Sequence, residues 1–320
     1  MKKLRAGVIG VGYLGKYHAQ KYAGMDNVDL VGVVDTEKSR AETVARQVGT
    51  RAYTSHLDLM GRVDAVSIAV PTPAHYAVGR DFLENSVDIL IEKPMTTSLE
   101  EADKLLEMAE SRGLIIQVGH LEEFNPAVVA AKEFVKRPMF IESHRLSIYN
   151  DRSTDVSVVL DLMIHDIDII LNLVKSEIKE IRAAGAPVTS KQVDIANARL
   201  EFENGCVANI TASRISTKNQ RKIRLFQRDG YLAVDFSKRE ITVINQVGQK
   251  DPSDLIPGME IKQLCFIEGD ALENEIRSFV TAVSSRKLPE VTGKMGRNAL
   301  KIALCIMAQI DSFTQRNLEN

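Results

Sequence analysis

The stretch RAGVIGVGYLG, residues 5–15, decides the fold of this chain. Its apolar residues run directly into the pattern G-x-G-x-x-G at Gly10, Gly12 and Gly15, and the residues that follow favour a helix. A strand that passes through such glycines into a helix is typical of a dinucleotide-binding loop. The first glycine permits a tight turn, the second lets the backbone approach a pyrophosphate, and the third permits close packing of helix and sheet. The helix N-terminus offers free N–H groups and a positive dipole to the phosphates.

An acidic residue lies where such a loop needs one. The second strand is predicted over Leu30–Val34 and runs into Asp35. A carboxylate there accepts hydrogen bonds from the ribose hydroxyls and repels a 2′-phosphate, so it favours NAD over NADP. Lys38 and Arg40 follow closely and soften that preference, so NADP remains an alternative. We therefore predict NAD as the cofactor, bound by Gly10, Gly12, Tyr13, Leu14, Gly15 and Asp35; a glycine turn in another kind of α/β protein is the alternative.

The composition indicates a globular protein. A chain of 320 residues is long enough for two domains. The net charge of −2 gives no reason to expect a nucleic acid or a membrane as partner. No apolar stretch approaches the roughly 20 residues needed to span a bilayer. Cys206, Cys265 and Cys305 are widely spaced, so we expect reduced, buried thiols and a cytoplasmic location.

Strands and helices alternate over the first ~120 residues, as in a doubly wound parallel sheet. Further strands are predicted over Asp64–Val70, Asp88–Ile91 and Leu114–Val118. Helices are predicted over about Tyr13–Ala23, Glu37–Val48, Ala74–Glu84 and Ser98–Arg112, the last with Ser98 and Glu101 as a capping box. This half is expected to be a Rossmann domain, residues 1–121.

The regular alternation of strands and helices ends at Gly119. Helices are predicted over Asn125–Lys136, Ser157–Val174, Glu268–Ser285 and Met295–Phe313. Strands are predicted over Phe140–Ser147, Glu180–Gly185, Ile195–Phe202, Val207–Ala212, Ile223–Phe226, Tyr231–Asp235 and Glu240–Ile244, followed by a polar loop over Gln246–Gly258. Asn-Gly and Asp-Gly hairpin turns join neighbouring strands. We therefore expect an α+β domain with a mostly antiparallel open sheet over residues 122–320.

Lys93 is the first candidate for chemistry. It follows a buried strand at the carboxyl edge of the sheet, where ligands collect, and Pro94 restricts the chain beside it. A lysine there can hydrogen-bond a substrate hydroxyl and stabilise an alkoxide. A surface lysine in a loop is the alternative. Other residues near this edge are also predicted to bind the cofactor: Pro71, Thr72, His75 and Glu92. His75 could instead cap the next helix.

The segment VVLDLMIHDIDII, residues 158–170, carries the second candidate site. On a helix Asp161 and His165 share one face, with Asp168 one turn further on. A histidine can take a hydroxyl proton near neutral pH, and a carboxylate one turn away can orient it. The alternatives are a structural buried histidine or a metal site that uses Asp161 and His165, although no further ligand has the spacing for one.

A looser group is predicted to bind substrate: His120, Asn125, Arg145, Tyr149 and Arg214. The stretch that contains His120 and Asn125 lies at the junction of the two predicted domains. Arg214 and the basic residues after it could bind an anionic substrate such as a sugar-nucleotide diphosphate. For those basic residues as a set, solvated strand faces are the competing interpretation.

Taken in order, these segments resemble the Gfo/Idh/MocA family of NAD(P)-dependent oxidoreductases along essentially the whole chain. The motifs that carry this resemblance are VIGVGYLGKYHA (8–19), VPTPAHY (70–76), EKPMTTSLEEA (92–102), GHLEEFNPA (119–127) and LDLMIHDID (160–168). The resemblance implies Lys93, Asp161 and His165 as the catalytic set, and an open sheet that often forms a dimer or tetramer interface. Glu123 departs from the pattern, because many relatives carry a basic residue there. Within the family, the chain resembles members that oxidise the 3-hydroxyl of UDP-N-acetylglucosamine.

The resulting hypothesis is reversible oxidation of a secondary alcohol on a sugar or nucleotide-sugar. His165 would take the hydroxyl proton while hydride leaves the same carbon for the nicotinamide. Lys93 would stabilise the oxygen, and Asp161 would orient the reacting groups. Two rivals are a non-catalytic NAD(P)-binding sensor on the same fold and a reductase of an imine or a non-sugar carbonyl.

Overall fold

The computed structural model describes residues 3–150, 156–246 and 258–318, with side chains as far as residue 312 in the last helix. By their contacts, the residues divide into two compact units. Unit 1 runs to Leu121 and includes Asp270–Leu300; unit 2 comprises Glu122–Gly269 and the chain from Lys301 onward.

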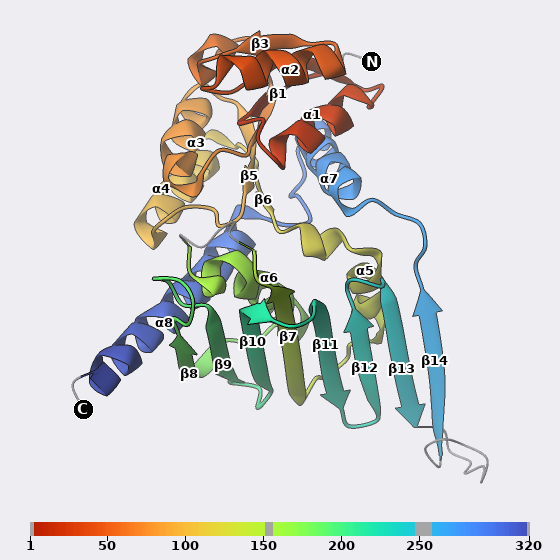
Figure 1. The fold of residues 1–320 in the computed structure, drawn as a ribbon. Coiled ribbons are helices and arrows are strands. Elements are labelled where there is room, and N and C mark those ends of the chain that lie inside the picture. The colour runs from red at the N-terminus through yellow and green to blue at the C-terminus, as the bar shows by residue number, and fades with distance from the viewer. Residues whose placement is uncertain (1–2, 151–155, 247–257, 319–320) are drawn as a thin grey trace. The chain divides into compact units, whose positions relative to one another are not determined.

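A six-stranded parallel sheet forms the centre of unit 1, in the order β3-β2-β1-β4-β5-β6 (Figure 1). The order reverses between β1 and β4, which is the point where dinucleotides bind in such sheets. The strands are β1 Leu4–Ile9, β2 Val28–Val34, β3 Arg51–Tyr53, β4 Ala65–Ile68, β5 Asp88–Glu92 and β6 Ile116–Gly119. The expected Rossmann fold of this half is confirmed, and only the three-residue β3 had no counterpart in the prediction.

The helices of unit 1 are α1 Gly15–Ala23, α2 Lys38–Val48, α3 His75–Glu84, α4 Leu99–Arg112 and α7 Ala271–Ser285. The Ser98 hydroxyl caps α4 by accepting the N–H of Glu101 at 3.3 Å. The Glu101 carboxylate in turn accepts the N–H of Thr97 at 3.1 Å, one residue earlier than a standard capping box requires. The predicted cap is therefore present in a slightly shifted form.

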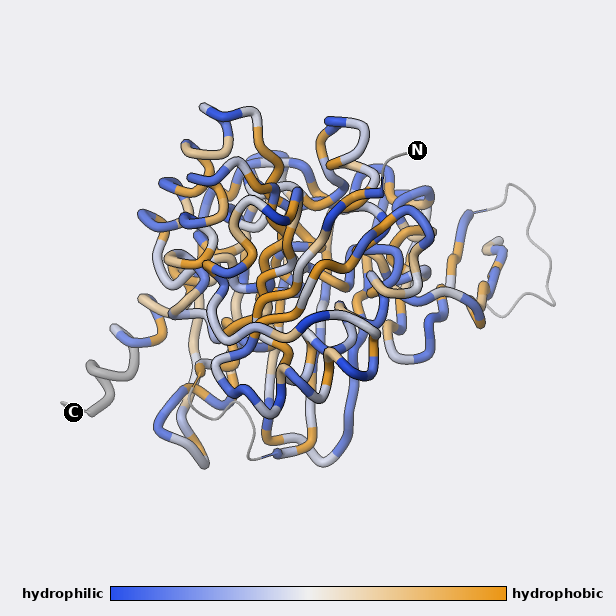
Figure 2. The backbone as a smooth tube through the Cα atoms, turned by 90° about the horizontal axis from the view of Figure 1, so that it is seen from above, coloured by the Kyte–Doolittle hydropathy of each residue, from blue (hydrophilic) through white to orange (hydrophobic). Residues whose placement is uncertain are grey.

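Helix α7 belongs to unit 1, although the sequence prediction placed it in the second domain. Its side chains Phe279 and Val283 are buried in one cluster with Val8 and Leu90 of the central strands. Helix α7 also packs beside α1 (Figure 1). Burying a side chain such as Phe279 contributes roughly 2 kcal/mol. The chain therefore returns to the first unit after completing most of the second. Figure 2 shows the apolar residues concentrated in central strands and polar ones in the loops.

An eight-stranded sheet forms the centre of unit 2, in the order β14-β13-β12-β11-β7-β10-β9-β8. Among the described strand pairs of this sheet, only β7–β10 is parallel, so the expected mostly antiparallel sheet is confirmed. The strands are β7 Phe140–Ile148, β8 Ile178–Ala186, β9 Ile195–Phe202, β10 Val207–Ser216, β11 Gln220–Gln227, β12 Gly230–Asp235, β13 Glu240–Gln246 and β14 Met259–Cys265. Edge strand β14 was not predicted, because its largely exposed residues lack an apolar alternation.

Helices α5 (Pro126–Phe134) and α6 (Ile164–Val174) pack on strands of this sheet. The long helix predicted over Ser157–Val174 is present, but its first part is a π-helical turn, Val159–Met163, that leads into α6. Helix α8 (Gly293–Leu318) starts in unit 1 and ends in unit 2, where the Gln309 amide bonds the backbone of β8.

Most of the predicted loop over Gln246–Gly258 lies outside the described residues. Of the free cysteines Cys206 is buried, but Cys265 and Cys305 are exposed, so the expectation that all are buried is wrong. Within the described part of the chain, no helix is both long enough and apolar enough to cross a membrane.

Candidate active site

The glycine loop that follows β1 has the geometry of a phosphate-binding turn. Gly10 has a φ of +82°, and a Cβ there would lie 2.7 Å from the carbonyl oxygen of Ala69. A Cβ on Gly15 would lie 1.8 Å from the carbonyl oxygen of Gly10. At Gly12, by contrast, none of the described heavy atoms lies within 4 Å of the Cβ position. Two glycines are therefore required by close packing, while the third leaves open space where a pyrophosphate would approach the backbone.

The start of α1 adds to this site. Leu14 precedes the helix, and no described side chain caps it. The N–H groups of Lys16 and Tyr17 donate to the carbonyl oxygens of Gly12 at 3.3 Å and Leu14 at 2.8 Å, so the helix start attracts an anionic ligand mainly through the positive end of its dipole. A pocket of about 640 Å³ borders this loop and extends from Gly12 and Tyr13 to Arg40 and Gln47 of α2. Its size suits the adenosine end of a dinucleotide.

Asp35 lies at the end of β2 and is 6% exposed. Its carboxylate accepts the N–H of Val11 at 3.1 Å and the N–H of Glu37 at 2.9 Å. The Arg40 guanidinium lies 3.2 Å from the same carboxylate and also pairs with Glu37. Arg40 Nη1 also lies 3.3 Å from the second carboxylate oxygen, so these contacts use the roughly four acceptor sites of Asp35. A ribose hydroxyl would therefore take the place of Arg40, while Asp35 holds the glycine loop through the N–H of Val11.

Replacing Asp35 with serine should weaken NAD binding by about tenfold and move the preference toward NADP. The substitution removes the acceptor of the ribose hydroxyls, and it leaves Arg40 with Glu37 as its remaining carboxylate partner and able to pair with a 2′-phosphate. Titration of the variant with both cofactors measures the effect. Asp58→Ser, at an exposed position, is the control. An unchanged ratio of the two affinities would show that Asp35 does not select the cofactor.

Lys93 directly follows β5, and the Lys93–Pro94 peptide bond is cis. The buried imidazole of His75 lies below this segment, with Nδ1 3.0 Å from the Pro94 carbonyl oxygen and Nε2 2.8 Å from that of Val70. Burial lowers the pKa of His75, so the ring is neutral and donates to one carbonyl at a time. His75 therefore links the segments that follow β4 and β5, which holds the chain next to Lys93.

His120 lies beside Lys93, because β6 is the neighbour of β5 and Glu92 pairs with Gly119. His120 is fully buried. Burial, and then the positive charge of Lys93, lower its pKa to about 3. The imidazole is therefore neutral at physiological pH. Within unit 1 the structure thus places these two predicted residues together.

Asp161 and His165 lie in unit 2, in the π-helical turn and the first turn of α6. Both side chains are half-buried. A π turn holds one residue more than an α-helical turn, so the two side chains do not have the simple i,i+4 relation that the sequence predicted. Such turns inside helices are frequent at functional sites. The half-buried His165 can exchange a proton with a ligand.

Two family models match the chain over most of its length. Residues 4–120 match the oxidoreductase family with an NAD-binding Rossmann fold, and residues 130–233 match the GFO/IDH/MocA C-terminal domain. UDP-N-acetylglucosamine 3-dehydrogenase from Acidithiobacillus ferrooxidans is 38% identical over 99% of this chain and 100% of its own length. This chain belongs to the Gfo/Idh/MocA family. It is therefore an NAD-dependent dehydrogenase.

Other relatives of this Gfo/Idh/MocA protein support the same assignment. The scyllo-inositol 2-dehydrogenase (NAD(+)) of Bacillus subtilis is 28% identical over 91% of this chain and 89% of the relative. A solved structure of the Acidithiobacillus ferrooxidans enzyme has a TM-score of 0.93 at 37% identity and covers 98% of this chain and 100% of that one. The fold and the chain length thus agree with a relative of known activity.

Asp168 of this family member has different surroundings from the half-buried His165. It is buried near Glu123, and Asn172 donates to both carboxylates, at 2.7 Å to Glu123 and 3.4 Å to Asp168. Burial, and then the charge of Glu123, raise the pKa of Asp168 well above its usual value. The Lys132 ammonium lies 2.9 Å from Glu123. Glu123, which departs from the family pattern, is therefore part of a buried cluster with Asp168.

Arg145 lies in the interior of unit 2. Its guanidinium forms two hydrogen bonds of 3.0 Å with Asp166 and one of 2.8 Å with Glu122, and it lies 5.2 Å from the ring centre of Phe236. Burial would lower the pKa of Arg145, but the two carboxylates raise it overall. The Asn125 amide also donates to Glu122 at 3.2 Å, and its oxygen caps α5. These contacts join β7, α6 and the start of α5, which is a structural role.

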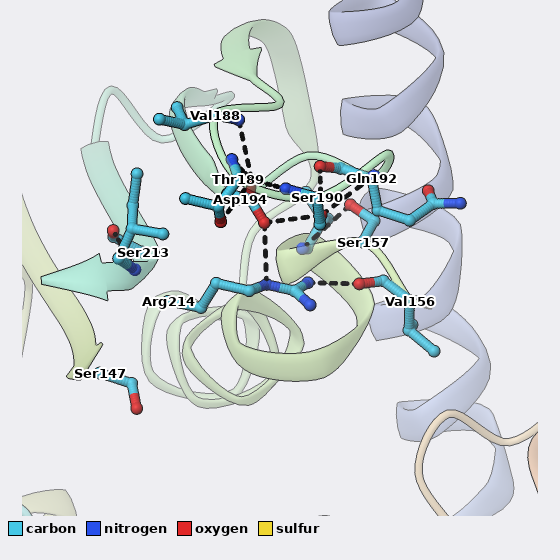
Figure 3. A network of polar contacts seen from close by, with 12 residues as sticks. Ser147, Val156, Ser157, Val188, Thr189, Ser190, Gln192, Asp194, Ser213 and Arg214 are labelled. Carbon is cyan, nitrogen blue, oxygen red and sulfur yellow. Dashed lines mark hydrogen bonds and ion pairs between the residues drawn. The ribbon is translucent and has the colours of Figure 1, made fainter. Parts of the chain in front are cut away.

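Arg214 is also buried, in the network that Figure 3 shows. It donates to the carbonyl of Val156, and its Nε lies 3.7 Å from Asp194. Burial would raise the pKa of Asp194, but the N–H groups of Ser190, Thr189 and Val188 and the Ser190 hydroxyl lower it strongly overall. Arg214 thus contributes to the order of this loop. Tyr149, at 43% exposure near the end of β7, is the most accessible of the predicted substrate residues.

Replacing Asp194 with asparagine should destabilise the protein by about 3 kcal/mol at neutral pH. The depressed pKa means that ionised Asp194 stabilises the fold above the ordinary aspartate pKa of ~3.9, and that this contribution is lost as pH falls below it. The free energy of unfolding of the variant should not show this decrease as pH falls below ~3.9. Urea unfolding at several pH values measures both effects, with the exposed Asp229→Asn as control. Equal stability of variant and wild type would contradict the assignment.

The sequence analysis missed several of these residues. Asp166, Glu122 and Asp194 are buried partners of predicted arginines, and nothing in the local pattern identified them. His18 and Glu275 are buried polar residues of α1 and α7. His18 lies within the quoted stretch VIGVGYLGKYHA, so an inward-facing histidine on the cofactor helix was the one available signal.

Proposed function

We propose that this dehydrogenase oxidises the 3-hydroxyl of UDP-N-acetylglucosamine to a ketone, with NAD as the oxidant. The observation that carries the proposal is the 38% identity, over the full length of both chains, to an enzyme with that substrate. The inositol dehydrogenases among the relatives act on ring alcohols as well, which supports a secondary ring hydroxyl as the reacting group.

The proposed mechanism assigns one role to each catalytic residue. Lys93 donates a hydrogen bond to the reacting oxygen and stabilises its negative charge. His165 takes the hydroxyl proton, and Asp161 orients the imidazole or the substrate. When bound, NAD supplies the hydride acceptor at nicotinamide C4. The carbon thereby loses a hydride and the oxygen a proton, which gives a ketone, NADH and one released proton.

The proposed binding residues fall into two sets. The cofactor set comprises Gly10, Gly12, Tyr13, Leu14, Gly15, Asp35, Pro71, Thr72, His75, Glu92 and Lys93. The substrate set comprises His120, Asn125, Arg145, Tyr149 and Arg214. The burial of Asn125, Arg145 and Arg214 favours an indirect role for them, through the order of the elements they join. The same holds for His120, which is 1% exposed, so Tyr149 is the preferred direct contact.

A substrate panel tests the proposal. Thermal shifts are measured with NAD, NADP, UDP-N-acetylglucosamine, UDP-glucose and scyllo-inositol, and each ligand that binds is then assayed at the NADH absorbance band. We expect NADH formation with UDP-N-acetylglucosamine and at least about tenfold lower kcat/KM with UDP-glucose, because a site built for the acetamido group leaves polar atoms unpaired without it. Oxidation of scyllo-inositol with no turnover of either UDP-sugar would overturn the substrate assignment.

We also infer a cytoplasmic homodimer or homotetramer that forms through the open face of the eight-stranded sheet. Residues alternate between buried and half-buried or exposed along β9 and β13, so one face of the sheet remains accessible in the isolated chain. Such a face is suited to pairing with a second copy. Light scattering after size-exclusion chromatography measures the assembly, and a monomeric mass at micromolar concentration would contradict it.

A further inference from the structure

Three titratable side chains from three elements meet inside unit 1. They are His18 of α1, Glu92 at the end of β5 and Glu275 of α7. His18 and Glu275 are fully buried, and His18 Nε2 lies 3.1 Å from Glu92 Oε1. One polar atom of each residue lies within 4.8 Å of the other two. We call these residues the buried acid cluster.

Glu275 is the residue that needs an explanation. Both of its carboxylate oxygens are buried and have no hydrogen-bond partner among the described residues. An ionised carboxylate in such a place, beside a second carboxylate, is strongly disfavoured unless it gains a proton or a cation. Burial, and then the charge of Glu92, raise the pKa of Glu275 well above its usual value. A proton on Glu275 removes both the cost of burying a charge and the repulsion from the charge of Glu92.

The groups around Glu275 supply little compensating charge. Helix α1 presents His18 and Tyr22, whose hydroxyl bonds Ser67. Strand β5 presents Glu92, and β6 presents Gln117, whose amide donates to the backbone carbonyl of Glu275 rather than to its side chain. Of these neighbours, only a protonated His18 would carry a positive charge, and its Nε2 already faces Glu92.

We propose that Glu275 is a neutral acid that shares its proton with Glu92, and that the buried acid cluster positions Lys93 for catalysis. The second half rests on the proposed function, since it takes Lys93 as the catalytic lysine. The Glu275 O–H is the donor and the Glu92 carboxylate the acceptor. Their oxygens lie within 4.8 Å of each other, and the proposed hydrogen bond forms when the two side chains move closer than they are in this structure.

The position of Glu92 explains how the cluster reaches Lys93. Glu92 is the peptide neighbour of Lys93, and its carboxylate rests against Gly119, where a Cβ would lie 2.9 Å from both oxygens. On the other side of Lys93, His75 bonds the Pro94 carbonyl. The lysine is therefore held between two anchored residues. The contact of Glu92 with His18 also connects it to α1, the helix that begins at the glycine loop.

Two variants of Glu275 test the proposal. Glu275→Gln should lose less than about threefold in kcat, because its amide N–H replaces the acid O–H as donor to Glu92. Glu275→Ala should lose at least about tenfold in kcat, because Glu92 and Lys93 lose the support that the glutamine variant keeps. If the alanine variant does not fold, Glu275→Met keeps the volume and serves in its place. Glu273→Gln, at a partly exposed site on the same helix, is the matched control and should match the wild type.

The pH dependence of unfolding tests the proton without any substrate. A raised pKa in the folded state means that the stability contribution of Glu275 is full below the ordinary glutamate pKa of ~4.3 and is lost as pH rises toward the raised value. Glu275→Gln cannot lose a proton. Its melting temperature should therefore rise relative to the wild type between about pH 5 and about pH 9. A difference in melting temperature that stays constant over that range would overturn the proposal of a shared proton, whatever the substrate of the enzyme is.

Three further outcomes would overturn the proposal or its positioning half. Equal loss of kcat in Glu275→Gln and Glu275→Ala would mean that the cluster needs a charged carboxylate. A stoichiometric divalent metal in the purified protein that is absent from Glu275→Gln would mean that the three side chains bind a cation instead. Wild-type kcat in all Glu275 variants would remove the positioning role. Activity that survives Lys93→Met would instead contradict the proposed function, and it would leave the unfolding result valid.

Discussion

Lys93→Met should reduce turnover by at least about a thousandfold while NAD still binds. Methionine keeps the length of the side chain but has no charge and no N–H donor. The reacting oxygen would then lose the group that stabilises its negative charge. NADH formation measures the turnover, and calorimetric titration with NAD measures binding. Lys104→Met, at an exposed position on α4, is the control and should behave as the wild type.

The same variant has a second readout that needs no substrate. The charge of Lys93 contributes to the low pKa of His120. Removing that charge should raise the pKa of His120, although burial should keep it below the ordinary value of ~6.5. NMR titration of the imidazole measures the change. An unaltered His120 together with near wild-type turnover would contradict the role of Lys93.

His165→Ala should lower kcat for alcohol oxidation by about a hundredfold to ten-thousandfold. A general base acts only when it is deprotonated, so the wild-type rate should rise with pH through the histidine pKa, near ~6.5 for an unperturbed ring. The kcat of the variant should not rise with pH in this way. The ratio of variant kcat to wild-type kcat should therefore be lowest above that pH. Steady-state kcat measured across the pH range tests both points.

A histidine outside the proposed site provides the control for this experiment. His56 lies in unit 1, and its Nε2 is 2.9 Å from Asp81. His56→Ala should keep the wild-type shape of the pH profile. If His165→Ala also kept that shape, His165 would not be the base, and Asp161 or Lys93 would have to take the proton.

The features that the sequence predicted well are local ones. The glycine spacing depends on backbone conformation and close approach within a few residues, and Gly10 and Gly15 show both. Short apolar runs between turn residues identified most strands, because strands buried in a sheet are rich in apolar residues and end at turns. It did not identify β14, whose residues are mostly exposed, or the three-residue β3.

Features that depend on distant partners were not predictable. Arg145 and Arg214 are both predicted substrate residues, and Arg214 is predicted to bind an anionic substrate because a guanidinium suits phosphate. Whether it binds a ligand or a buried carboxylate depends on residues such as Asp166 and Asp194, which only the fold brings close. The return of α7 to unit 1 has the same cause, because its apolar face does not specify which core it completes.

By itself, the sequence determined the cofactor loop, the Rossmann order of elements and the presence of a lysine and a histidine suited to hydride-transfer chemistry. These follow from patterns in which neighbouring residues act on each other through the backbone. Only the tertiary structure decided the π turn between Asp161 and His165, the neutral state of His120 and the meeting of His18, Glu92 and Glu275. Burial and charge at those positions come from residues far away in the chain, and a one-dimensional pattern does not contain those distances.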